Sequence, residues 1–183
     1  SFFTKEPRSA DYVAWHQDLH YWGLDARDEV TVWVASSQAS VESGCMRFVP
    51  ASHIKEAPHA DRPAKGAMLS RGQELAVDVD PADATDIELR AGEASFHHGH
   101  LYHASGPNSS DDRRIGIAIR LIMPAMKQRG AEKLTLTKIS GTDNFGHFTQ
   151  GQPPRGFVDD DDFAEALADR ELRNSIMFAG AKQ

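Results

Sequence analysis

The sequence predicts a mainly β protein, a double-sheet jelly roll with helices on one outer face. Three observations point to this fold class. Short segments alternate between apolar and polar residues, and turn-forming residues separate these segments. Candidate metal ligands lie on segments that are far apart in the chain, as they do when a site forms inside a jelly roll.

The predicted strands rest on the alternation of side chains between the two faces of an extended chain. The segment 29–36 shows the pattern well, since its three valines share one face and Thr31, Trp33 and Ala35 share the other. The short segment 12–16 is expected to continue as a strand through His20. The full set of expected strands is 2–5, 12–20, 29–36, 45–49, 86–89, 94–98 and 114–121.

Two further segments are not strand-like. The stretch 53–84 is the least regular part of the chain, with several prolines and glycines among many charges. We interpret it either as an insertion over the mouth of an active site, where it would act as a lid, or as a solvated linker. A helix is expected over 159–173, because acidic residues crowd its start and arginines lie near its end. Phe163, Leu167 and Ile176 supply an apolar stripe for docking.

The composition restricts the class of protein. The chain has 183 residues, enough for one domain with a core, and a formal net charge of −7, which disfavours nucleic-acid binding. No apolar run approaches the roughly 20 residues of a membrane-spanning helix. The single cysteine, Cys45, rules out an internal disulfide and fits a reducing, cytoplasmic location. We therefore expect a cytoplasmic enzyme with a small-molecule substrate, of undetermined oligomeric state.

A His-x-Asp pair, His16 and Asp18, is the first chemical signal. Residues i and i+2 of a strand point to the same side, so both side chains can bind one metal ion, and a third ligand must come from elsewhere. Two imidazoles and one carboxylate leave open positions that suit non-heme Fe(II), whereas a structural zinc site would need four ligands. The histidine-rich run from His97 to His103 is the source of the third ligand.

An arginine at the start of the last predicted strand is the second signal. Arg114 shares a face with Gly116 and Ala118, whose small side chains leave space for a small dianion beside the guanidinium. The neighbouring Arg113 points the other way. A guanidinium binds a carboxylate through two parallel hydrogen bonds, so Arg114 is the expected anchor for a carboxylate cosubstrate.

These segments together resemble the phytanoyl-CoA dioxygenase family of Fe(II)/2-oxoglutarate-dependent oxygenases. The resemblance runs from about Lys5 to Leu121. Its motifs are Lys5-Glu6-Pro7, His16-Gln17-Asp18-Leu19-His20-Tyr21, Gly44-Cys45-Met46-Arg47-Phe48-Val49-Pro50-Ala51-Ser52-His53, and His98-Gly99-His100-Leu101-Tyr102-His103-Ala104-Ser105-Gly106-Pro107-Asn108 with Arg114. Ala51 departs from the glycine that is common in the family at this turn.

The resemblance implies a double-stranded β-helix and specific roles for site residues. His16, Asp18 and His103 would bind Fe(II), with His98 as the reserve for His103. Ser105 and Arg114 would bind 2-oxoglutarate, and Trp33 would face the same site. Related domains carry further elements before the His-x-Asp strand, so we expect 1–183 to be a single domain that lacks its N-terminal portion.

The expected activity is hydroxylation of an unactivated C–H bond of a small molecule, with O2 as a cosubstrate and with succinate and CO2 as coproducts. His20, Tyr21 and Trp22 follow the metal ligands closely and are candidates for the wall of a substrate pocket, although Trp22 alone is as well explained by packing in the core. Two alternatives stay open. One is a cupin-like metalloenzyme without 2-oxoglutarate, and the other is a non-catalytic jelly-roll protein that binds a small molecule.

Overall fold

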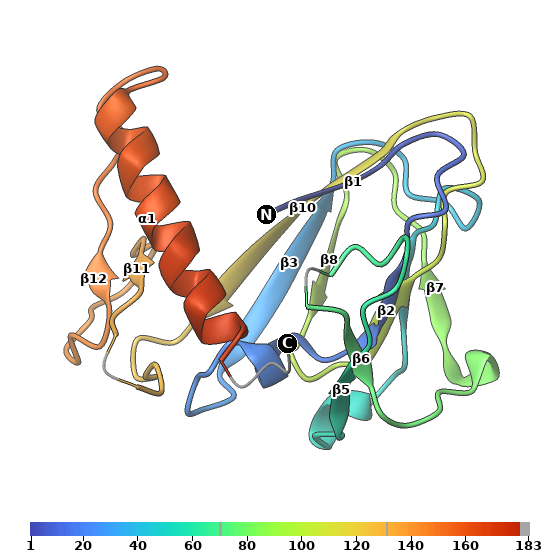
Figure 1. The fold of residues 1–183 in the computed structure, drawn as a ribbon, viewed down its shortest axis with the longest axis horizontal. Helices are drawn as coiled ribbons and strands as arrows, with labels where there is room; N and C mark the ends of the chain where they lie inside the picture. The colour runs from blue at the N-terminus through green and yellow to red at the C-terminus, as the bar shows by residue number, and fades with distance from the viewer. Residues whose placement is uncertain (70, 131, 180–183) are drawn as a thin grey trace. The chain divides into compact units, whose positions relative to one another are not determined.

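The computed structural model describes residues 1–69, 71–130 and 132–179 (Figure 1). The described residues form two compact units. The first unit comprises Ser1–His20 and Glu29–Leu121, and the second comprises Tyr21–Asp28 and the described residues from Ile122 onward. Every residue that lines the candidate site belongs to the first unit.

The first unit contains two four-stranded sheets, and this arrangement confirms the predicted double-stranded β-helix. In spatial order, the strands of one sheet are β1 (Phe2–Lys5), β10 (Arg114–Ile122), β3 (Glu29–Ala35) and β8 (Ala94–His97). Those of the other are β2 (Val13–His16), β9 (His103–Ser105), β4 (Met46–Phe48) and β7 (Thr85–Ile87). Figure 1 shows β1, β10 and β3 running alongside one another. Strands that are far apart in the sequence therefore lie together in each sheet.

The hydrophobic core is small and lies beside β3. It is formed by Trp33, Ala35, Ala39, Cys45, Met46 and Ala118. The inward face of β3 changes character along its length, because Glu29 and Thr31 are as buried as Trp33 and Ala35. The valines of β3 occupy the less buried face, as the predicted alternation requires. One end of this strand therefore brings buried polar groups into the interior.

The expected strand over 12–20 is wrong beyond His16. Strand β2 ends at His16, and Asp18 begins a 3-10 helix, η1 (Asp18–Tyr21). The chain leaves the sheet at Gln17, whose backbone N–H bonds to Nε2 of His59 (3.1 Å) instead of to a neighbouring strand. Asp18 and His16 still come together, but through the turn into η1 and not through the alternation of side chains along a strand.

The Gln17 side chain anchors the irregular segment. Its amide donates to the carbonyls of Lys55 (2.9 Å) and His100 (2.6 Å), and its oxygen accepts from the N–H of Ala57 (2.9 Å). Because Gln17 is fully buried, these bonds satisfy the polar atoms of its own side chain, which water cannot reach.

The segment 53–84 therefore has defined structure in its described part. It contains most of η2 (Ser52–Ile54), an antiparallel pair of strands, β5 (His59–Asp61) and β6 (Gln73–Leu75), and η3 (Pro81–Asp83). The Arg71 guanidinium pairs with Asp61 at 2.9 Å. These contacts argue against a solvated linker, while the role of the segment as a lid stays a prediction.

The second unit contains the helix that the sequence predicted. Helix α1 (Asp160–Met177) is capped by Asp159, whose carboxylate accepts from the N–H groups of Asp161 and Asp162 (both 3.0 Å). It extends four residues beyond the predicted end. A short parallel pair, β11 (Thr135–Leu136) and β12 (Thr149–Gln150), belongs to the same unit.

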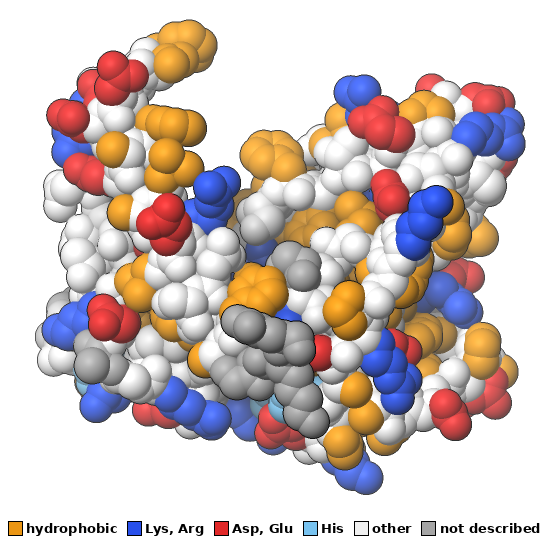
Figure 2. Space-filling view, viewed as in Figure 1, with side chains coloured by type: hydrophobic (Ala, Val, Ile, Leu, Met, Phe, Trp, Pro, Cys, Tyr) orange, Lys and Arg blue, Asp and Glu red, His pale blue; other side chains and the backbone are white. Residues whose placement is uncertain are grey.

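Apolar side chains gather along α1 on the face shown in Figure 2. Phe163, from the predicted apolar stripe, is 66% exposed, whereas Leu167 and Ile176 are half-buried. Within the described part of the chain, no helix combines the length and the apolar character that crossing a bilayer requires.

Candidate metal centre and adjoining pocket

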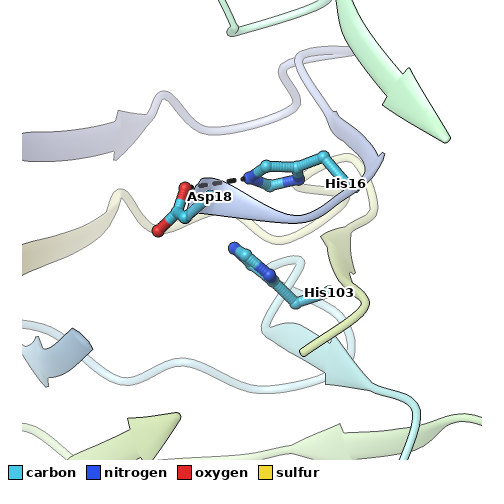
Figure 3. A group of neighbouring side chains, drawn as sticks. All are labelled: His16, Asp18 and His103. Carbon is cyan, nitrogen blue, oxygen red and sulfur yellow. Dashed lines mark ion pairs between the residues drawn. The ribbon is translucent and has the colours of Figure 1, made fainter. Parts of the chain in front are cut away.

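His16, Asp18 and His103 come together inside the first unit, as Figure 3 shows. One ligand atom from each residue lies within 4.8 Å of the others. The two histidines are direct cross-strand neighbours in the antiparallel pair β2–β9, and their ring centroids are 4.0 Å apart. Asp18 Oδ1 is 3.4 Å from His16 Nε2. Two imidazoles and a carboxylate therefore face one small volume.

Both histidines are oriented by the same kind of hydrogen bond. His16 Nδ1 lies 2.9 Å from the carbonyl of Ala14, and His103 Nδ1 lies 2.9 Å from the carbonyl of Leu101. A carbonyl only accepts, so each Nδ1 must carry the proton and each Nε2 is left with a lone pair. This backbone support is what a metal-binding imidazole requires, and it fixes the ring as well as the tautomer.

The charge states of His103 and Asp18 also suit a metal ion. Burial holds the pKa of His103 well below its usual range, so its imidazole is neutral and able to coordinate. Burial alone would raise the pKa of Asp18, but His16, His103 and Arg120 outweigh it and hold that pKa below its usual range. Asp18 is therefore a carboxylate. A buried carboxylate beside two imidazoles is a donor set that fits a divalent cation.

Arg114 and Ser105 lie in the same pocket as the three candidate ligands. Arg114 is 2% exposed, and its Nη2 lies 3.5 Å from Ser105 Oγ. Burial lowers the pKa of Arg114 to about 10, which still leaves the guanidinium charged at neutral pH. Arg113 is exposed and pairs with Glu6 at 3.0 Å. The structure therefore separates the two arginines in the way the strand pattern predicted.

Trp33 contacts this arginine. The Arg114 guanidinium lies 5.3 Å from the centre of the Trp33 ring, within the range of a cation–π interaction. The prediction that Gly116 leaves space for a dianion needs correction. A Cβ at Gly116 would lie 1.8 Å from Trp33 Cζ2, so the indole already occupies that space. Only Ala118, which lines the pocket, leaves room as predicted.

The pocket encloses about 440 Å³ of empty space, including its open mouth. Its walls come from both sheets, with His16 and His103 from one and Arg114, Trp33 and Ala118 from the other, and Asp18 is added from η1. Phe3, Val13, Met46 and Leu69 add apolar surface. Leu69 belongs to the segment 53–84, which therefore contributes to the pocket wall.

Several buried polar groups in and around this pocket were given no role by the sequence analysis. His97 lines the pocket at 4% exposure, and among the described residues neither of its ring nitrogens has a hydrogen-bond partner. Burial lowers the pKa of His97 to about 4, so the ring is neutral and offers one donor and one acceptor. Thr31 Oγ1 lies 2.8 Å from Glu29 Oε1 and 3.5 Å from Asp18 Oδ2.

The alternation of side chains along β3 and β8 is the sequence signal that could have identified His97 and Thr31. His97 pairs with Thr31 in the register of β3 and β8, so both point to the same side of the sheet. The sequence predicts both strands, but it does not show which face of either strand meets the site.

The remaining histidines of the run lie outside the trio. The N–H of His100 donates to His98 Nδ1 (2.9 Å), and the His98 ring lies 5.6 Å from both His53 and His100. His98 therefore takes part in the turn before β9. Its use as the reserve ligand is not supported by this arrangement.

The three candidate substrate residues occupy different environments. His20 is exposed, stacks on His59 at 4.0 Å between ring centroids, and lies 3.2 Å from Glu56. Tyr21 is buried and Trp22 is half-buried in the second unit, where the Gln128 side chain donates to the Trp22 carbonyl (2.9 Å). None of the three lines the pocket described above. Their role in substrate binding stays a prediction.

Comparisons with known proteins agree with this geometry. A family model described as "Phytanoyl-CoA dioxygenase (PhyH)" matches residues 1–116. A phytanoyl-CoA dioxygenase domain-containing protein 1 homolog of Caenorhabditis elegans is 27% identical over 128 residues, which cover 66% of this chain and 44% of that protein. The chain thus spans less than half the length of this relative.

Two solved structures are also similar. The non-heme monooxygenase ThoJ in its apo form is 34% identical, with a TM-score of 0.83 over 98% of this chain and 66% of that one. EvdO2 from Micromonospora carbonacea var. aurantiaca, complexed with 2-oxoglutarate, is 28% identical, with a TM-score of 0.60 over 73% of this chain and 55% of that one.

Proposed function

Since the chain belongs to the phytanoyl-CoA dioxygenase family, we propose that it is a hydroxylase that oxidises an unactivated C–H bond of a small molecule. Members of this family use Fe(II), 2-oxoglutarate and O2. The observation that carries the proposal is the shared pocket, in which three candidate metal ligands and a buried arginine face the same space. A jelly-roll protein without catalysis would have no need of both features.

In this proposal His16, Asp18 and His103 hold the iron. Bound there, Fe(II) would supply the activation of O2 that 2-oxoglutarate drives as it is oxidised to succinate and CO2. One oxygen atom of O2 enters succinate and the other enters the substrate as a hydroxyl group. The protein's part is to orient both imidazoles, to hold His103 neutral and Asp18 ionised, and to keep the site largely screened from water.

Arg114, Ser105 and Trp33 bind the cosubstrate in this scheme. Arg114 pairs with the carboxylate of 2-oxoglutarate that is remote from the metal, and Ser105 adds a hydrogen bond to it. Trp33 packs against the guanidinium and limits the directions in which it can turn. His97, with its two unpartnered ring nitrogens, is a candidate contact for a polar group of the substrate.

The test is succinate release from 2-oxoglutarate, measured with Fe(II) against a panel of small organic acids. An active substrate raises succinate release and gains one oxygen atom by mass spectrometry. The Asp18→Ala variant is expected to lose at least about 99% of this turnover, because a ligand and its charge are both removed.

Two outcomes would contradict the proposal. Iron-dependent turnover without 2-oxoglutarate, unaffected by Arg114→Ala, would indicate a cupin-like enzyme. Tight binding of a small molecule with no iron-dependent product would indicate a binding protein.

A further inference from the structure

Two buried cations face each other across β1 and β10. Lys5 is directly opposite Arg114 in the register of this antiparallel pair, and the two side chains are 0% and 2% exposed. Among the residues that the structure describes, neither cation forms an ion pair with a carboxylate. Like charges at opposite positions destabilise a sheet, and buried charge without a partner is costly. The pair therefore calls for an anion.

The Ser105 hydroxyl lies between these cations. Its Oγ accepts from Lys5 Nζ at 2.7 Å and is 3.5 Å from Arg114 Nη2. A hydroxyl has two acceptor positions and one proton, so two donors leave the proton free to point elsewhere. Ser105 makes no other side-chain hydrogen bond within the described residues, and it lines the pocket. Its proton is thus available to an acceptor in the pocket.

Lys5 itself does not line the pocket. Its ammonium is held behind Ser105, where it also donates to the carbonyl of Gly106. The Asn108 side chain fixes the backbone at this point by donating to the carbonyls of Lys5 (3.3 Å) and Glu6 (3.0 Å). These contacts hold the Lys5 ammonium against Ser105, so Lys5 can influence a ligand in the pocket through the Ser105 hydroxyl.

From this arrangement we propose that Lys5 is a positioning residue for the remote carboxylate of 2-oxoglutarate. It directs the Ser105 proton into the pocket, and its charge adds to that of Arg114 behind the carboxylate. This inference rests on the proposed function and extends it to a residue to which the sequence analysis assigned no role.

The electrostatic surroundings of Lys5 favour an anionic ligand beside it. Burial and, to a smaller extent, the nearby Arg114 lower the pKa of Lys5 to about 7, while Asp11 and Cys45 act in the opposite direction. Burial also raises the pKa of the Cys45 thiol to about 11, so this thiol is uncharged at neutral pH. An anion next to Ser105 would favour the protonated form of Lys5.

Calorimetric titration of the Mn(II)-loaded protein under anaerobic conditions provides the test. Two probes share the 2-oxo acid end, but 2-oxobutyrate lacks the remote carboxylate that 2-oxoglutarate carries. Lys5→Met is expected to weaken 2-oxoglutarate binding by about tenfold or more and to leave 2-oxobutyrate binding within about twofold. Lys138→Met, at an exposed lysine of the second unit, is the matched control and should change neither.

The outcomes separate this inference from the proposed function. Wild-type protein that fails to bind 2-oxoglutarate with Mn(II) would overturn both. Wild-type protein that binds it, with Lys5→Met binding equally well, would overturn only the role of Lys5. Equal weakening of both probes by Lys5→Met would show a general structural effect and would also overturn that role. In the double variant Lys5→Met/Ser105→Ala, the losses should be less than multiplicative because Lys5 acts through Ser105.

Discussion

At the scale of the residue, backbone carbonyls decide the chemistry of the candidate ligands. The carbonyls of Ala14 and Leu101 hold the Nδ1 protons of His16 and His103, so Nε2 is the nitrogen of each ring that can bind a metal ion. The same local order applies to both, since each carbonyl lies two residues before its histidine. Short-range backbone geometry therefore presets two ligands that come from distant parts of the sequence.

The adjacent arginines offer a matched comparison. Arg114→Gln should raise the KM for 2-oxoglutarate by at least about thirtyfold, because truncating one partner of a buried charge pair costs roughly 2 kcal/mol or more. Arg113→Gln should leave it within about twofold, since Arg113 is exposed and pairs with the exposed Glu6. Steady-state succinate kinetics measure both. Equal effects from the two variants would contradict the assignment of Arg114.

Glu29 makes stability depend on pH. Burial raises its pKa from 4.5 to about 7. Between these values the unfolded chain has released the proton that the folded protein still holds, so the free energy of unfolding falls as pH rises from about 4.5 to about 7. Glu29→Gln carries no such proton. Over this range the free energy of unfolding of the variant should fall by less than that of wild type, and the difference between the two losses should be roughly 2–3 kcal/mol.

Urea denaturation of metal-free protein at pH 5 and pH 8 measures this difference. Glu88→Gln, at an exposed carboxylate, serves as the control and should follow wild type. A Glu29→Gln variant that loses stability in parallel with wild type would show that Glu29 titrates normally.

At the scale of the element, neighbouring strands share space by matching a large residue with a small one. Trp33 on β3 fills the volume above Gly116 on β10, next to Arg114. This packing couples the core to the pocket, because the same indole stacks on the guanidinium. A glycine is needed at position 116 for close approach and not for its backbone conformation.

Gly116→Ala tests this packing. The added methyl would overlap the indole, so we expect a loss of about 1–3 kcal/mol in the free energy of unfolding and a shift in tryptophan fluorescence. Gly156→Ala is the control, because a Cβ there meets nothing within 4 Å. If Gly116→Ala proves as stable as wild type with unchanged fluorescence, the indole does not occupy this space in solution.

At the scale of the molecule, a metal ion would join β2 and β9 at His16 and His103, which are far apart in sequence. A ligand that binds only the folded state stabilises it by about 2.7 kcal/mol at a concentration one hundred times its Kd. Fe(II) or Mn(II) should therefore raise the Tm by roughly 5–10 °C, and a chelator should reverse the change.

His103→Ala should abolish this metal-dependent shift, measured by scanning calorimetry without oxygen. His53→Ala changes an exposed histidine outside the trio and should preserve it. A shift that survives His103→Ala would place the metal elsewhere.

The sequence by itself determined the fold class, the two clusters of candidate site residues, and which of two arginines is buried. Each of these rests on local order, such as the alternation within a strand or the spacing of a motif. Local order did not show the turn at Asp18. The Gln17 N–H that follows β2 donates to His59, which is far along the chain.

Only the tertiary structure decided which distant groups share a site. It placed Lys5 opposite Arg114 and His97 opposite Thr31, and it filled the space above Gly116 with Trp33. The physical reason is that sheet register and burial are set by all the strands together. A residue's own neighbours in sequence determine the side to which it points, whereas the opposing strand determines what it meets there.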